Sequence, residues 1–155
     1  MPKIRLITDV TASVERVFDL ARNIDLHKTS MEGTNEEAIA GQTSGLIELG
    51  ETVTWRARHF GIYQTLEARI TEMESPVRFV DEMMRGAFAS MHHTHLFETY
   101  GAGTRMTDAF VYTSPLGLLS RFADWLFLEK YMTRLLRQRN DMLKHIAENL
   151  VVLEK

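Results

Sequence analysis

The stretch "TRMTDAFVYTSPLGLLSRFADWLFLEKYM", residues 104–132, joins the two patterns that decide the fold. Its first ten residues alternate in side-chain character, as in a β-strand with one covered face. Ser114 is a natural helix N-cap, and Pro115 suits the first helical position. The helical spacing of apolar residues then continues to about residue 149. Roughly 33 helical residues would span about 50 Å, so this helix must lie across a sheet.

Six stretches upstream have the length and the side-chain pattern of further strands. They are residues 3–10, 35–40, 51–60, 63–74, 77–84 and 88–100. The predicted turns are Gly61, Ser75 with Pro76, Arg85 with Gly86, and residues 101–103. Consecutive strands at hairpin spacing predict an antiparallel meander, which usually has one covered face and one wet face.

Two short helices are predicted between the first strand and the meander. Residues 11–22, "TASVERVFDLAR", carry apolar side chains at helical spacing, and residues 23–31 form a second short helix or turn. The candidate N-caps are Thr11 or Ser13 for the first and Asn23 or Asp25 for the second.

The predicted fold class is therefore α+β. A curved antiparallel sheet of about six or seven strands is joined by two short helices and by one long C-terminal helix across its concave face. We expect a single domain over residues 1–150, followed by a tail over residues 151–155. A sheet that curls around a helix commonly leaves a cavity between the two.

Composition excludes several classes of protein. The chain has 155 residues, net charge −3 and no cysteine. Disulfides, thiolate chemistry and cysteine-bound zinc are thereby excluded, and the negative charge argues against a nucleic-acid partner. No run approaches the roughly 18 apolar residues of a membrane-spanning helix, and no signal peptide is recognised. We expect a cytoplasmic protein without an integral membrane segment; its oligomeric state is left open.

Basic residues gather on the long predicted helix. They are Arg121, Lys130, Arg134, Arg137, Arg139 and Lys144. We interpret them as the solvated face of an amphipathic helix. The alternative is a module that uses this face to contact another protein, an anionic partner or a membrane surface.

The order of these elements resembles the START/Bet v 1-like superfamily, also called SRPBCC, and its helix-grip fold. The opening "ITDVTASVERVFDLARNID" resembles the first strand and first short helix of that superfamily. The segments "GETVTWRARHFG", "RFVDEMMRGAF", "HHTHLFE", "TRMTDAFVYTSPLG" and "RFADWLFLEKYM" resemble a group of small bacterial polyketide cyclase/dehydrase-like members. The resemblance covers essentially the whole chain. It implies the fold more specifically than the reaction, because one fold can support many functions.

The run "SMHHTHLFE", residues 90–98, carries three histidines, and strand parity divides them. Residues two apart share a face of a strand, so His93 and His95 point together and His92 points the other way. On neighbouring strands, the same rule puts Asp81 and Asp108 among apolar residues. If these faces are the concave one, the interior holds two histidines and two carboxylates.

Three interpretations of this polar set remain open. A metal site would use His93, His95 and a third ligand, either Asp81 or Asp108. An acid–base site would pair a histidine with a carboxylate, as in a cyclase or dehydratase. A binding pocket would use the polar groups to orient a largely apolar ligand, or they would simply satisfy one another in the core.

We expect a protein that binds a small hydrophobic or amphipathic molecule between the sheet and the long helix. A polyketide cyclase/dehydratase-like enzyme is the alternative, and His93, His95, Asp81 and Asp108 are its candidate catalytic residues. We expect no cofactor and no bound metal. The candidate ligand-binding residues are Trp55, Phe79, Asp81, Met83, Met91, His93, His95, Phe97, Met106, Asp108, Phe110, Tyr112, Leu128 and Met132.

Overall fold

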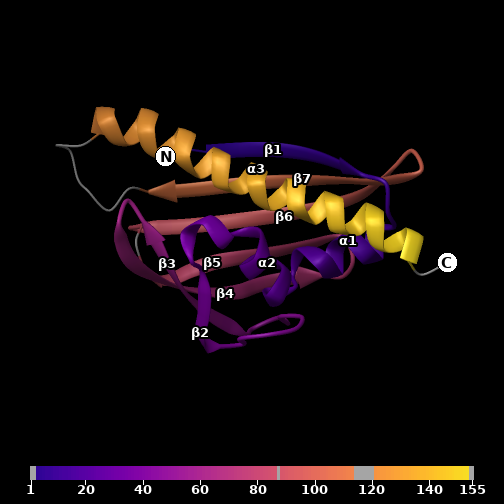
Figure 1. The fold of residues 1–155 in the computed structure, drawn as a ribbon, viewed down its shortest axis with the longest axis horizontal. Coiled ribbons are helices and arrows are strands. Elements are labelled where there is room, and N and C mark those ends of the chain that lie inside the picture. The colour runs from indigo at the N-terminus through magenta and orange to yellow at the C-terminus, as the bar shows by residue number, and fades with distance from the viewer. Residues whose placement is uncertain (1–2, 87, 114–120, 154–155) are drawn as a thin grey trace.

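The fold is a seven-stranded antiparallel sheet with all its helices on one face (Figure 1). The computed structural model describes residues 3–86, 88–113 and 121–153. The predicted N-cap Ser114 and first helical residue Pro115 lie outside these described residues. The predicted fold class is confirmed.

The strands follow the order β1-β7-β6-β5-β4-β3-β2 across the sheet. From β2 to β7, each strand pairs with the next strand in the sequence. Strand β1 pairs with β7 and forms one edge of the sheet. The strands are β1 (Lys3–Val10), β2 (Glu37–Gly41), β3 (Thr52–His59), β4 (Ile62–Glu74), β5 (Arg78–Gly86), β6 (Ser90–Tyr100) and β7 (Gly103–Thr113).

The two short helices are α1 (Val14–Ala21) and α2 (Ile24–Ser30), and a 3₁₀ turn, η1 (Glu32–Thr34), follows them. Among the candidate caps, Ser13 accepts a hydrogen bond from the backbone of Arg16, and Asn23 accepts one from the backbone of Leu26. Each cap satisfies a backbone donor that a helix start leaves free.

The long helix α3 (Arg121–Leu153) crosses the sheet diagonally, next to α1 and α2 (Figure 1). It continues to Leu153, so the helix enters the stretch that we expected to be a tail. No helix in the described part of the chain combines the length and the apolar character needed to cross a membrane.

The core is solid toward the C-terminal end of α3. Leu143 and Ala147 are fully buried against a cluster that includes Phe18 of α1. The Phe18 ring meets Phe79 and Phe97 of the sheet edge-on, with centroids 5.6 and 5.3 Å apart. Because α1 fills this end of the concave face, any cavity must lie under the earlier turns of α3.

One local prediction is corrected. The predicted turn at Arg85 and Gly86 is wrong, because β5 runs through Gly86, which pairs with Leu66 of β4. A Cβ on Gly86 would lie 2.9 Å from the Leu66 Cα, so this close approach of two strands explains the glycine. The pairing of the long strand β6 with β7 contains no bulge and runs unbroken from Ser90 to Tyr100.

The register shifts instead interrupt the β4–β5 pairing, at Glu67/Ala68 and at Ile70/Glu72. The alternation of side chains along β5 nevertheless puts Asp81 on the expected face. Phe79 and Asp81 both point to the concave side, because Phe79 is buried in the core and Asp81 lines a cavity there.

Candidate functional site

A cavity of about 340 Å³ lies between the sheet and the first half of α3. Alternate residues of the strands form its floor, and α3 supplies its roof at spacings of three and four residues. The roof residues are Leu128, Tyr131, Met132, Leu135, Leu136 and Arg139. The apolar part of the floor and sides is formed by Met31, Trp55, Ala57, Phe60, Leu66, Ala68, Phe88, Met91 and Phe110. Most of the wall is therefore apolar, as is usual for small-molecule sites.

Strand register brings the two histidines and the two carboxylates together at the inner end of this cavity. Asp81 of β5 lies opposite His93 of β6, and Asp108 of β7 lies opposite His95. The hydrogen bonds run diagonally rather than straight across. His93 Nε2 is 2.8 Å from Asp108 Oδ1, and His95 Nε2 is 2.7 Å from Asp81 Oδ2.

The second nitrogen of His95 also faces a carboxylate, since Nδ1 lies 3.2 Å from Asp108 Oδ1. The rings of His93 and His95 are stacked with centroids 3.8 Å apart. The four side chains thus form one continuous group, which we call the His–Asp cluster and which is buried except for the partly exposed Asp81.

Helix α3 adds two polar residues to the His–Asp cluster, and the sequence analysis missed both. Asn140 donates to Asp108 Oδ2 at 2.8 Å, and the Arg139 guanidinium lies 3.6 Å from Asp108 Oδ1 and 3.4 Å from His95 Nδ1. The assignment of Arg139 to the solvated face is wrong, because this residue is 6% exposed. Helical spacing puts it on the buried stripe, four residues after Leu135.

Burial and neighbouring charges determine the protonation states of Asp81, His93 and Asp108. Burial, helped by the charge of His95, lowers the pKa of His93 to about 4 against the opposing effect of its Asp108 hydrogen bond. Burial alone would raise the pKa of Asp108, but the Arg139 charge and the histidine hydrogen bonds hold it well below its ordinary value. The His95 hydrogen bond and neighbouring positive charges likewise outweigh burial and lower the pKa of Asp81. At neutral pH both carboxylates are ionised and His93 is neutral.

The tautomer of His93 follows from these charges. An ionised carboxylate only accepts hydrogen bonds, so His93 Nε2 must carry the proton that Asp108 accepts. The lone pair of the neutral ring then resides on Nδ1, which has no hydrogen-bond partner among the described residues. Because His93 lines the cavity, it offers a basic nitrogen whose orientation is set by a buried carboxylate.

A metal ion is the competing use of the same residues. Asp81, His93 and His95 each offer one ligand atom, and these atoms lie within 4.8 Å of one another. The Arg139 guanidinium beside His95 opposes a second cation at this place. The positive charge of Arg139 already balances part of the negative charge of the two carboxylates. The charge arrangement therefore favours a proton-binding cluster over a metal centre.

A second polar group lies at the outer end of the cavity and was largely missed by sequence reasoning. His59 Nδ1 and the Tyr131 hydroxyl are 2.6 Å apart. A separate polar pair in the cavity wall is His27 with Glu36: His27 Nε2 lies 2.9 Å from Glu36 Oε1, the His27 ring packs on Trp55, and His27 also lines the space beside His95. Tyr131 follows the helical stripe three residues after Leu128, which was an available signal. His27 and Glu36 meet through loop geometry that no periodicity reports.

The predicted ligand-binding residues divide into three groups. Seven line the cavity: Trp55, Asp81, Met91, His93, Phe110, Leu128 and Met132. Phe79 and His95 line a smaller adjoining cavity of about 90 Å³, which is large enough for water. The remaining five are packed behind these walls, outside either cavity: Met83, Phe97, Met106, Asp108 and Tyr112. The cavity thus uses only the part of the concave face that α1 leaves open.

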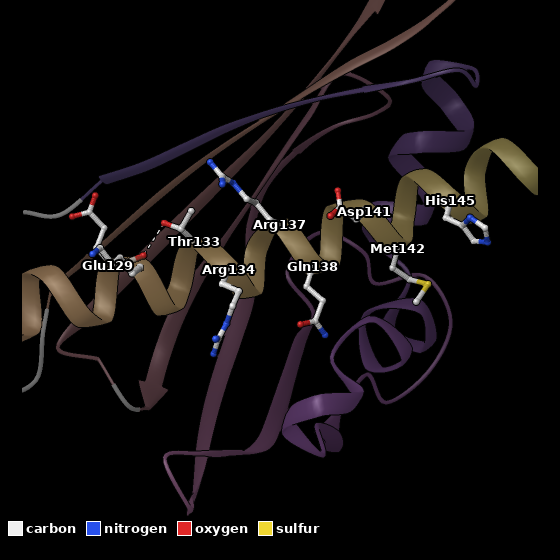
Figure 2. Close-up of a pocket in the computed structure, with 9 residues that line it drawn as sticks. Glu129, Thr133, Arg134, Arg137, Gln138, Asp141, Met142 and His145 are labelled. Atoms are coloured by element: carbon white, nitrogen blue, oxygen red, sulfur yellow. Dashed lines mark hydrogen bonds between the residues drawn. The ribbon is translucent and has the colours of Figure 1, made fainter.

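A wider depression of about 900 Å³ follows the outer side of α3 (Figure 2). Every described residue that lines it belongs to that one helix, so the described part of the chain gives it no facing wall. Its charges are mixed, with Glu129 and Asp141 beside Lys130, Arg134 and Arg137. This is the composition of a solvated helix face, and the enclosed cavity is the better candidate site.

Comparison with known proteins agrees with this architecture. The sequence profile of the family described as "Polyketide cyclase / dehydrase and lipid transport" matches residues 1–148. No curated protein matches the chain. The family and the fold fit ligand binding or polyketide cyclase-like activity.

Several solved structures share the fold at low sequence identity. The protein TTHA0849 from Thermus thermophilus is 21% identical, with a TM-score of 0.67 over 92% of this chain and 97% of that chain. A START superfamily protein from Mycobacterium smegmatis is 11% identical, with a TM-score of 0.72 over 96% and 98%. The major latex-like protein 151 of Panax ginseng is 14% identical, with a TM-score of 0.58 over 90% and 95%.

These structural likenesses concern the fold alone, while the profile match spans nearly the whole sequence. The chain belongs to the polyketide cyclase/dehydrase and lipid transport family.

Proposed function

We propose that this protein binds a small amphipathic molecule in the cavity between the sheet and α3. The apolar part of the ligand contacts Met91, Phe110 and Met132, and its polar end reaches Asp81, His93 and Arg139. The observation that carries the proposal is this combination of an apolar wall with a buried polar end. A core that needed only packing would gain nothing from ionised groups that are expensive to desolvate.

Native mass spectrometry of the purified protein tests for a co-purifying molecule. Calorimetry with 4-phenylphenol, which has one hydroxyl on an apolar skeleton, then tests the cavity directly. Ala57→Phe fills space in the cavity wall and should weaken this binding by at least about tenfold. Ala109→Phe makes the same change on β7, beside Asp108 and outside the residues that line the cavity, and should leave binding unchanged.

A thermal melt of each variant shows whether it folds. If Ala57→Phe does not fold, Met132→Trp fills the cavity from the helix side instead. Absence of both a co-purifying molecule and measurable 4-phenylphenol binding would contradict the proposal. So would equal binding by the wild type and by a folded, cavity-filled variant.

A second candidate function is acid–base catalysis of the cyclase or dehydratase type. The pair of His93 and Asp108 favours it, because a neutral imidazole that lines the cavity and is oriented by a carboxylate is arranged as a general base. His93 would take a proton from the carbon beside a ligand carbonyl. Arg139 would stabilise the negative oxygen that this step creates.

Exchange of carbon-bound hydrogen for deuterium provides a minimal assay of that step. The probe is 1-phenyl-1,3-butanedione in deuterated water, followed by proton NMR. Base-catalysed exchange removes one proton to His93 and returns one deuteron, so no other reactant is needed. The rate should fall about 100-fold or more in His93→Gln and stay unchanged in His92→Gln. Equal rates for the wild type and His93→Gln would exclude this function.

A further inference from the structure

We infer that the cavity recognises its ligand at both ends, so that the ligand carries a hydroxyl-type group at each end of an apolar middle. This inference rests on the proposed binding function and specifies the class of ligand. It arises from the outer polar pair, His59 and Tyr131, for which the proposed function has no use. Both residues line the same cavity as Asp81 and His93.

The inner end offers both kinds of hydrogen-bonding group. His93 Nδ1 is an acceptor, and Asp81 has a second carboxylate oxygen besides the one that His95 uses. Arg139 has five N–H donors, and its described contacts are the long ones to Asp108 and His95. A group that both donates and accepts, such as a hydroxyl, satisfies this end.

The outer end also offers one donor and one acceptor, whichever way the His59–Tyr131 hydrogen bond runs. If the tyrosine donates to His59 Nδ1, the neutral imidazole keeps an N–H at Nε2 and the phenol oxygen can accept. If His59 Nδ1 donates, the tyrosine O–H is free and Nε2 accepts. Burial lowers the pKa of His59, which keeps the ring neutral at pH 7 in either case. A hydroxyl again matches both groups.

Apolar side chains of α3 lie between the helix residues of the two ends. Tyr131 and Arg139 lie eight residues apart on α3, which corresponds to a rise of about 12 Å. Met132 and Leu135 line the wall between them, facing Met91 and Leu66 of the sheet. A ligand with a single polar end would leave one of the two polar groups against apolar atoms, at a cost in binding. An elongated apolar skeleton with two polar ends avoids that cost.

The test compares 4,4′-dihydroxybiphenyl with 4-phenylphenol, which differ only in the second hydroxyl. We expect wild-type protein to bind the dihydroxy compound about tenfold more tightly by calorimetry, since one added hydrogen bond contributes roughly that factor. This ratio exceeds the statistical advantage of two equivalent orientations. In Tyr131→Phe and His59→Leu the preference should fall to that statistical advantage, while 4-phenylphenol still binds. Tyr63→Phe makes the same change at an exposed position and should keep the full preference.

Each outcome is decisive. If no molecule co-purifies and neither biphenyl compound binds, the proposed function itself fails. If both compounds bind wild-type protein equally apart from statistics, the cavity binds ligands but two-ended recognition is overturned. A preference that survives in both Tyr131→Phe and His59→Leu also overturns it, because the second hydroxyl is then recognised elsewhere. Loss of the preference in these two variants and its persistence in Tyr63→Phe support the inference.

Discussion

The two faces of β6 carry the same kind of histidine–carboxylate pair in opposite surroundings. On the convex face, His92 lies 3.9 Å from Glu82 of the neighbouring strand, and both side chains are roughly 40% exposed. On the concave face, His93 lies 2.8 Å from Asp108, and both are buried. The residues are adjacent in sequence, so strand parity alone determines which histidine meets solvent.

The difference shows what a buried pair requires that an exposed pair does not. Water solvates the side chains of His92 and Glu82, and no further partner is needed. Asp108 has lost its water and receives hydrogen bonds or charge from His93, His95, Arg139 and Asn140 in its place. Such an arrangement seldom adds stability over an apolar core. Its presence beside a cavity is therefore an argument for function rather than for folding.

The largest expected effect is the loss of Asp108. Asp108→Ala leaves the Arg139 charge and the cluster donors buried without an acceptor, and should lower the free energy of unfolding by about 3–5 kcal/mol. Glu82→Ala removes the corresponding carboxylate of the convex face, and should change it by no more than about 0.5 kcal/mol. Urea unfolding followed by circular dichroism measures both. Similar losses in the two variants would break the comparison.

The second prediction concerns pH and isolates His93. Its pKa is about 4 in the folded protein and has an ordinary value of 6.5 in the unfolded chain, so the unfolded chain takes up the proton first as pH falls. The stability contributed by keeping His93 neutral is fully present above pH 6.5 and is lost as pH falls toward 4. The shift corresponds to about 3 kcal/mol.

His93→Gln should remove most of this pH dependence from the unfolding free energy between pH 6.5 and 4. The pKa of His59 is lowered too, so a slope of the same sign remains in every variant, and the comparison is between slopes. His92→Gln should keep the wild-type slope. A His93→Gln slope equal to the wild-type slope would mean that folding does not lower the pKa of His93.

The sequence predicted which residues lie on each face of the sheet, because the alternation of side chains along a strand depends only on local sequence. The concave positions of His93, His95, Asp81 and Asp108 follow from parity once the strands are located. The diagonal pairing of histidines with carboxylates does not follow. It depends on the register between strands, which turn lengths and tertiary packing set.

The contribution of Arg139 and Asn140 of α3 to the His–Asp cluster could have been predicted from helical spacing. Arg139 and Asn140 lie three and four residues after Leu136, which places both on the buried side of α3. Arginine is seldom buried, and this general tendency was allowed to outweigh the helical spacing. The contact between His27 and Glu36 was harder to predict. Glu36 reaches His27 from the segment after η1, and that contact depends on a loop conformation without a repeating pattern.

The third prediction concerns the apolar support of the concave histidines. The Phe79 ring stacks on His95, with centroids 4.1 Å apart and planes 15° apart. Phe79→Leu keeps most of the buried volume but removes the stack, and should cost about 1 kcal/mol. Leu96→Met on the convex face, where Leu96 is 40% exposed, should cost less than about 0.5 kcal/mol. Thermal melts report both. An unchanged Phe79→Leu protein would show that hydrogen bonds alone hold His95.

The smallest expected effect is that of His92→Ala, and it sharpens the comparison most. His92 is separated from Glu82 by more than a hydrogen-bond length, and water competes for both groups. We expect a change of no more than about 0.5 kcal/mol in unfolding free energy, and no change in 4-phenylphenol affinity. Any small loss should shrink further at high salt, because exposed charges are screened. A large, salt-insensitive loss would mean that His92 packs against other groups instead, and that solvent exposure does not distinguish the two faces of this strand.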